Sequence, residues 1–178
     1  MKRRLLVLTL LGLPLGVGAQ SDWQTVVGRD LRFRLEMPAP AEESKAAEKE
    51  KGHAAERVAW HAARDGEMFD FDYVDYLPGW FSERDSKVMA KELGRGAAEK
   101  AFPPSKYKYA KDEPVTLQGW DGYALDIENA DGALTMMRTY IVKDRLYRLL
   151  VTAKNDEQAR AAANRFLNSL KLAESRPS

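Results

Sequence analysis

Two aspartates at alternate positions are the clearest candidate metal ligands in the sequence. Asp70 and Asp72 lie in the run FDFDYVDY at residues 69–76, and residues two apart on a strand share one face of a sheet. Two carboxylates on one face could bind a hard divalent cation such as Ca²⁺ or Mn²⁺, which requires several oxygen ligands. The pair lacks the glycine-containing loop typical of calcium sites. The alternative is a strand with buried aromatic residues and solvated aspartates.

A loop rich in aromatic residues follows this strand directly. Residues 69–81 hold six of the seventeen aromatic residues in the chain. Exposed aromatic side chains on a loop bury a large area at low entropic cost when a partner binds. Tyr76, Trp80 and Phe81 are therefore the candidate partner-binding residues. In the alternative interpretation, Trp80 and Phe81 cover the end of the core where the first helix docks.

The sequence contains no pattern typical of a catalytic site. His53 and His61 are the only histidines, and their spacing is not that of metal ligands or of a nucleophile and its base. A Gly-x-Ser-x-Gly nucleophile elbow is also missing. Two distant carboxylates could in principle act as in a glycosidase, but no feature here indicates it. We predict no catalytic residues and expect a protein that is not an enzyme.

Three arginines, Arg138, Arg145 and Arg148, flank the last predicted hairpin. Together they could bind an anionic partner. Arginines on an antiparallel sheet more commonly pair with carboxylates on neighbouring strands, and Asp126 and Glu128 lie on a strand predicted nearby. We favour this second interpretation.

The first nineteen residues have the parts of a secretory signal peptide. Three basic residues at positions 2–4 precede an apolar run, and Val17-Gly18-Ala19 provides small residues before a cleavage point at Gln20. The apolar run is short for a membrane span and contains Pro14. We therefore expect export to a bacterial periplasm and no membrane anchor after cleavage, leaving residues 20–178 as a single domain.

Composition excludes several classes of function. The chain has no cysteine, so disulfides, thiolate metal sites and lipid attachment at a cysteine are impossible. The formal net charge of the 178 residues is +1, which gives no basic surface of the kind that nucleic acids require. No cofactor is predicted, apart from a divalent cation at Asp70 and Asp72.

Alternating apolar and polar residues predict a largely antiparallel sheet. Strands are expected at residues 31–37, 55–64, 68–76, 123–128, 133–142 and 145–153, with weaker candidates at 107–110 and 115–117. Asp65-Gly66 is a strong hairpin signal because both turn positions need positive φ. Residues 41–52 are almost entirely Ala, Glu and Lys and have no apolar stripe, which predicts a solvated, mobile excursion.

Two helices complete the predicted α+β class. Ser82 and Asp85 form a capping box that opens a helix reaching about Lys100. Asn155 can cap the last helix. The apolar residues of that helix recur with helical spacing and form one stripe to be buried: Ala159, Ala162, Ala163, Phe166, Leu167 and Leu170.

Several of these segments carry a family resemblance. Gly119-Trp120-Asp121-Gly122, the strands RTYIV at 138–142 and RLYRL at 145–149, and the helix ending FLNSLKL at 166–172 resemble small exported proteins of the PsbP/DcrB-like group. With Trp23 and the strand from Phe33 to Pro38, the resemblance spans about residues 23–172. It implies a central antiparallel sheet with helices packed on both faces, an α/β/α sandwich. It also implies an accessory, assembly or binding role without shared catalytic residues.

These observations favour a non-enzymatic periplasmic accessory or binding protein. It would contact an unknown protein or small ligand of the cell envelope through the aromatic loop. The alternative is a protein that binds a small ligand or a divalent metal through Asp70 and Asp72.

Overall fold

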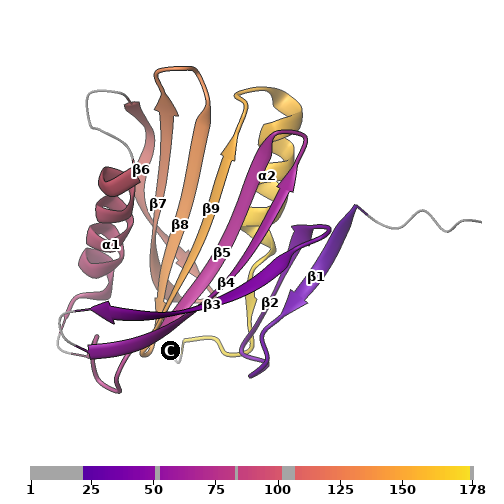
Figure 1. Cartoon of the computed structure of the whole chain (residues 1–178). Coiled ribbons are helices and arrows are strands. Elements are labelled where there is room, and N and C mark those ends of the chain that lie inside the picture. Colours follow the sequence, from indigo (N-terminus) through magenta and orange to yellow (C-terminus); the bar gives the residue numbers. More distant parts are fainter. Residues whose placement is uncertain (1–21, 51–52, 83, 102–106, 177–178) are drawn as a thin grey trace, which may run out of the picture.

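A computed structural model of the chain describes residues 22–50, 53–82, 84–101 and 107–176. The predicted signal peptide at residues 1–19 lies outside these residues. Within them, seven antiparallel strands form one large sheet in the order β3-β4-β5-β9-β8-β7-β6 (Figure 1). These strands are β3 (Glu42–Glu50), β4 (His53–Arg64), β5 (Glu67–Asp75), β6 (Tyr107–Leu117), β7 (Trp120–Asn129), β8 (Leu134–Val142) and β9 (Arg145–Ala153).

Tight turns join the strands where the sequence predicts hairpins. Asp65 and Gly66 adopt φ values of 52° and 84° between β4 and β5, so this predicted turn is confirmed. Lys143, with φ of 55°, lies in the turn between β8 and β9. The β4–β5 and β8–β9 hairpins then pair through β5 and β9, which lie next to each other at the middle of the large sheet.

A smaller sheet packs against the large one. It has the order β1-β2-β10 and is formed by β1 (Trp23–Val27), β2 (Phe33–Pro38) and β10 (Lys171–Leu172). The Phe33 ring lies 4.7 Å from the Phe71 ring and 5.6 Å from the Trp60 ring, centroid to centroid. Aromatic packing of this kind joins the two sheets into one core.

The two helices cover opposite faces of the large sheet (Figure 1). Helix α1 (Ser86–Ala101) packs on β7 and β8, and helix α2 (Glu157–Ser169) packs on β2, β5, β8 and β9. Neighbouring residues of β8 show this division, because Met136 belongs to the core beneath α2 and Met137 to the core beneath α1. The predicted sandwich is therefore confirmed. Neither helix in the described part of the chain could span a membrane.

The capping residue of each helix lies later in the sequence than predicted. Asp156, not Asn155, caps α2, and its carboxylate accepts a hydrogen bond of 2.9 Å from the Ala159 backbone N–H. At α1 the Asp85 carboxylate accepts a bond of 2.8 Å from the Lys87 N–H. The Ser82 hydroxyl donates instead to the Gly79 carbonyl, so the predicted capping box is wrong in detail.

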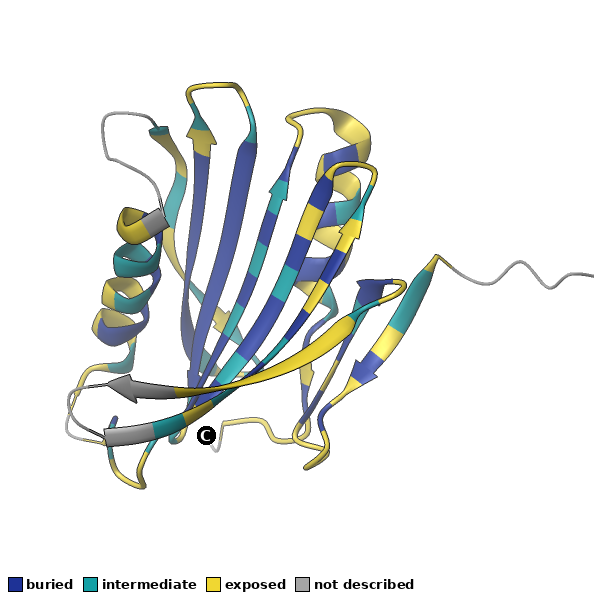
Figure 2. Ribbon diagram, in the orientation of Figure 1, coloured by how far each residue is buried: buried dark blue, intermediate teal, exposed yellow. Residues whose placement is uncertain are grey.

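For residues 41–52 the predicted exposure to solvent is confirmed at residues 42–47, but the expected excursion from the sheet is wrong over residues 42–50. Residues Glu42–Glu50 form strand β3, which pairs with β4 along nine positions from Glu42↔His61 to Glu50↔His53. Residues 42–47 are exposed, and Figure 2 shows this edge of the sheet in yellow. An edge strand bonds half of its backbone groups to one neighbour and the rest to water, so it forms without an apolar face. Residues 51–52 lie outside the described residues.

Candidate functional site

The aromatic loop at residues 76–82 is anchored to the turn between β8 and β9. The Tyr76 backbone N–H donates to the Asp144 carbonyl at 2.8 Å, and the Gly79 N–H donates to the Asp144 carboxylate at 2.8 Å. Gly79 has φ of 82°, a value that a side chain strongly disfavours. The Ser82 hydroxyl closes the turn through a 2.7 Å bond to the Gly79 carbonyl. The loop is thus held at two points and turned by one glycine.

The three predicted partner-binding residues meet in this loop. The Tyr76 and Trp80 rings stack 5.8 Å apart, and the Tyr76 ring lies 4.9 Å from the Phe81 ring. Phe81 is buried in the core beneath α1, whereas Tyr76 and Trp80 are only half-buried. The two interpretations of the loop therefore divide between its residues: Phe81 serves the core, and Tyr76 and Trp80 keep part of their surface in solvent.

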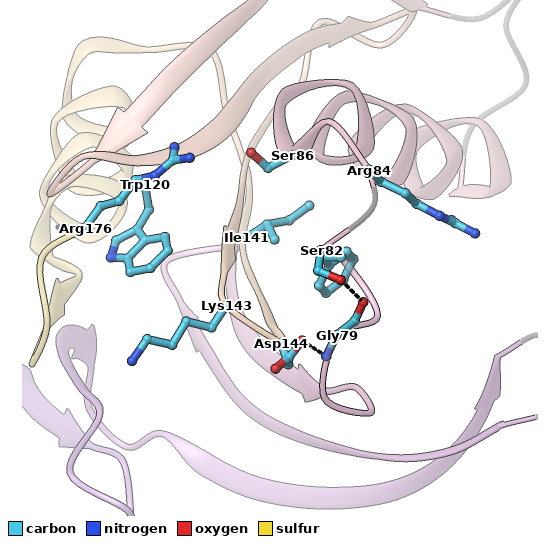
Figure 3. Close-up of a pocket in the computed structure, with 10 residues that line it drawn as sticks. Gly79, Ser82, Arg84, Ser86, Trp120, Ile141, Lys143, Asp144 and Arg176 are labelled. Carbon is cyan, nitrogen blue, oxygen red and sulfur yellow. Dashed lines mark hydrogen bonds between the residues drawn. The ribbon is translucent and has the colours of Figure 1, made fainter. Parts of the chain in front are cut away.

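Two cavities flank the loop and share one wall. The smaller cavity, of about 180 Å³, is lined by Tyr76, Trp80 and residues of the first turns of α1. The larger one, of about 440 Å³, lies between the loop, the start of α1 and the turn at Asp144 (Figure 3). Phe81 and Arg84 line both cavities. A group bound in either cavity would therefore touch the aromatic loop.

The far wall of the larger cavity comes from distant parts of the chain. Trp120 begins β7, and Arg176 lies in the C-terminal segment, which Figure 3 shows beside Trp120. The Trp120 indole N–H donates to the Glu174 carbonyl at 3.3 Å. The Arg176 backbone N–H donates to the Gln118 carbonyl at 3.0 Å. These bonds hold the C-terminal segment against the turn that precedes β7.

The cations of the larger cavity differ in their pairing. Arg176 donates to Asp121 at 2.7 Å, and Lys143 pairs with Glu174. Arg84 lies 5.8 Å from the centre of the Trp80 ring and donates to the sulfur of Met89 at 3.7 Å. Among the described residues no carboxylate pairs with Arg84. Its guanidinium is therefore the charged group of this cavity that is most available to a ligand.

The Asp121 carboxylate is buried and bonds to two residues that line this cavity, Ser86 and Arg176. Burial by itself raises the pKa of this carboxyl. The hydrogen bonds from the Ser86 hydroxyl, at 2.5 Å, and from Arg176 outweigh burial and hold the pKa of Asp121 below its usual range. Asp121 is therefore a charged anchor for α1 and the C-terminal segment.

The two candidate metal ligands lie on one face of β5, as predicted, but each already has a partner. Asp72 is buried and accepts hydrogen bonds from Arg57 at 2.9 Å and Arg148 at 3.0 Å. Asp70 lies 2.8 Å from the Nδ1 atom of His61. No group of three His, Asp or Glu side chains gathers in the described part of the chain. A cation at Asp72 would have to displace two guanidinium groups.

All three arginines singled out in the sequence pair with carboxylates. Arg138 bonds to Asp126 at 2.5 Å, as predicted, and Arg148 bonds to Asp72. Arg145 is buried and bridges Asp75 and Asp30, at 2.5 and 2.7 Å, with its guanidinium 4.0 Å from the Tyr73 ring. Burial by itself lowers the pKa of Arg145. The hydrogen bonds to Asp75 and Asp30 outweigh burial and hold this pKa above its ordinary value, so Arg145 stays charged. The pairing interpretation is confirmed.

Sequence reasoning missed four residues that line the larger cavity: Arg84, Trp120, Lys143 and Arg176. The segment Gly119-Trp120-Asp121-Gly122 is typical of a turn, but Trp120 begins β7 after a turn at Gln118 and Gly119. Arg176 is four residues beyond the last predicted element. The sequence marks only Trp120 as a candidate binding residue, through its aromatic ring. The other three are brought to the cavity by the fold, which leaves no spacing pattern in the sequence.

These elements define a class of protein: an α+β domain with an antiparallel sheet, a helix on each face and a ligand-sized cavity at an aromatic loop. The structure of cyanobacterial PsbP (CyanoP) from Synechocystis sp. PCC 6803 is similar over 91% of this chain and 98% of that chain, with a TM-score of 0.58 and 10% sequence identity. The fold is PsbP-like. The resemblance predicted for residues 23–172 is confirmed at this level.

Two further solved structures are similar to the chain at a lower level. LpqN, involved in cell envelope biogenesis of Mycobacterium tuberculosis, matches 85% of this chain and 91% of that chain, with a TM-score of 0.46 and 12% identity. A protein from Bacteroides thetaiotaomicron VPI-5482 matches 84% of this chain and 48% of that chain, with a TM-score of 0.43 and 11% identity. No protein-family model and no curated protein matches the sequence.

Proposed function

We propose that the protein is a non-enzymatic binding protein of the periplasm that contacts a protein partner through its aromatic loop. The observation that carries the proposal is the stack of Tyr76 and Trp80, which is half-exposed at the smaller cavity and packs against buried Phe81. Rigid aromatic side chains at the rim of a cavity are typical of the residues that dominate protein interfaces.

The chemistry of the site supports binding rather than catalysis. The two serine hydroxyls that line the larger cavity are bonded to the Gly79 carbonyl and to the Asp121 carboxylate. A serine nucleophile needs a neighbouring base to activate it, and no histidine is among the residues that line either cavity. The smaller cavity is lined by the half-exposed rings of Tyr76 and Trp80 and by the guanidinium of Arg84.

The export signal in the sequence supports the location. The basic start, apolar run and small residues before Gln20 are typical of a signal peptide. The partner is therefore sought in the periplasm or among proteins that face it.

Site-specific photo-crosslinking in whole cells tests this proposal. A benzoylphenylalanine at position 80 is expected to give a discrete covalent adduct with one protein, recovered in the periplasmic fraction. The matched control is the same group at Tyr109, an aromatic residue on β6 that is 42% exposed. We expect no such adduct at position 109.

An Arg84→Gln variant extends the test without altering the core. Because Arg84 lies over the Trp80 ring and on the walls of both cavities, this change should weaken the adduct formed at position 80. Identical adducts at positions 80 and 109, or none at position 80, would refute the placement of the partner surface. Recovery of the protein in the cytoplasmic fraction alone would refute the location.

A further inference from the structure

A third cavity, of about 450 Å³, lies between the small sheet and the end of α2. None of its lining residues belongs to the aromatic loop. Arg34 and Glu36 come from β2, Lys171 from β10, and Arg165 and Ser169 from the last turns of α2. The volume lies in the range of small-molecule sites, about 300–1,000 Å³. Almost all of its lining side chains are polar.

The unusual feature of this cavity is a pair of like charges on neighbouring strands. Arg34 and Lys171 are direct partners in the register of β2 and β10. The Cβ atoms of such a pair are about 4.5–5.5 Å apart, and like charges at this separation destabilise a sheet. Among the described residues, neither side chain forms an ion pair. The fold thus holds two positive charges together without compensating them.

Three other polar residues of the cavity, Glu36, Arg165 and Ser169, already have partners. Arg165 donates to the Glu36 carboxylate at 2.8 Å, and its guanidinium lies 4.3 Å from the centre of the Trp23 ring. The Ser169 hydroxyl accepts a bond of 2.9 Å from the Glu36 backbone N–H. These contacts fix the walls of the cavity and leave the charges of Arg34 and Lys171 for a ligand.

The end of α2 compensates only part of this charge. The C-terminus of a helix carries roughly half a negative elementary charge, and α2 ends at Ser169 beside the cavity. Two full positive charges therefore exceed what the helix end offsets. A phosphate monoester carries roughly −1.5 to −2 at pH 7 and offers three strong acceptor oxygens, which matches the excess in sign and size.

We propose that this cavity binds a phosphate monoester, with Arg34 and Lys171 as the residues that recognise the phosphate. The cavity volume leaves room for a small polar body attached to the phosphate. The site shares no lining residue with the aromatic loop, so an experiment that refutes one proposal leaves the other unaffected.

Calorimetric titration with sn-glycerol 3-phosphate at low salt tests the site. We expect saturable binding to the protein, no binding of glycerol, and at least tenfold weaker binding in an Arg34→Gln/Lys171→Gln variant. The matched control is Lys108→Gln/Lys154→Gln, which removes the same charge from two exposed lysines that line none of the three cavities described here. This control should bind as the unmodified protein does.

A melting curve without ligand adds an independent readout. Because the like charges repel, the Arg34→Gln/Lys171→Gln variant should melt at the same temperature as the unmodified protein or higher. A lower melting temperature would show a structural role for the pair and overturn the proposal. Equal weakening of binding in both double variants would also overturn it, since that result indicates non-specific screening.

Vesicles of phosphatidylcholine containing phosphatidic acid distinguish the source of the phosphate, because their anionic headgroup is itself a phosphate monoester. Binding to these vesicles alone, lost in Arg34→Gln/Lys171→Gln, would support the site and identify a lipid headgroup as the ligand. Binding of neither the free ester nor the vesicles would refute the site.

Discussion

The two faces of strand β5 are held in place by different forces. On one face Phe69 and Phe71 are fully buried. Phe69 lies 5.6 Å from the Phe166 ring of α2, and Phe71 stacks 6.2 Å from the Tyr147 ring. This face is part of a dry core, where each large side chain contributes through burial and close packing.

On the other face of the same strand, polar side chains form ion pairs. Asp72 lies between Arg57 and Arg148, and Asp70 bonds to His61. Helix α1 packs on this side of the sheet, but its contacts are with β7 and β8. Strands β4 and β5 lie outside the main contacts of this helix. The alternation of apolar and polar residues in β5 therefore matches its packing. The apolar face lies beneath α2, and the face of Asp70 and Asp72 lies outside the main contacts of α1.

The largest expected effect concerns the core face. Phe166→Ala should lower the free energy of unfolding by about 3–5 kcal/mol, because a buried aromatic ring leaves a cavity that its neighbours fill only in part. Urea denaturation measures this loss. The control is Asn164→Ala on the exposed side of the same helix, which should change stability by less than about 0.7 kcal/mol. Equal effects would contradict the difference between the faces.

A smaller effect is expected for the ion-paired face. Asp72→Asn should cost about 1.5–3 kcal/mol, the range for hydrogen bonds to charged groups. The side chains of Arg57 and Arg148 are 37% and 22% exposed, so water can hydrate them after the change. Asp70→Asn is the matched control two residues away, and its half-exposed contact with His61 should be worth no more than about 1 kcal/mol.

The same aspartates allow a test of metal binding. We expect Ca²⁺ and Mn²⁺ to shift the melting temperature of the protein no more than that of an Asp70→Asn/Asp72→Asn variant, because two guanidinium groups occupy the Asp72 carboxylate. A larger shift in the unmodified protein would restore the alternative function, in which this face binds a divalent cation.

The sequence predicts that β5 has one apolar and one polar face. It does not predict which helix packs on each face. Alternation and the Asp65-Gly66 turn depend on neighbouring residues, so both were predicted correctly. Strand β3 was missed because its only support is pairing with β4. A segment of Ala, Glu and Lys carries no local signal for such pairing.

In the candidate site too, contacts between residues close in sequence could be predicted, whereas contacts between distant elements could not. Tyr76, Trp80 and Phe81 are close in sequence, so their contact could be predicted, but the depth of each ring depends on how α1 docks. Trp120 and Arg176 line the same cavity as the loop only in the folded chain. Residues that converge from separate elements leave no spacing in the sequence by which to find them.

Glu67 sharpens the comparison, because it places a carboxyl at the start of β5 on the same side as Phe69 and Phe71, where Asp75 at the other end pairs with Arg145. It is buried, and among the described residues no cation forms an ion pair with it. Burial raises the pKa of Glu67, and the nearby charges of Asp65 and Asp156 raise it further. A carboxyl with a raised pKa in the folded state binds its proton more tightly there than in the unfolded chain.

This sign fixes the dependence on pH. The contribution of Glu67 to stability is fully present below its unfolded pKa, near the ordinary value of 4.5, and is lost as pH rises through the higher folded pKa. Glu67→Gln should therefore stabilise the protein at pH 7, by on the order of 0.5 kcal/mol, and give no gain at pH 4. Urea denaturation at the two pH values measures the difference. A gain of the same size at both would show that charge burial at this end of β5 has no cost, and that the polar and apolar faces differ less than the structure indicates.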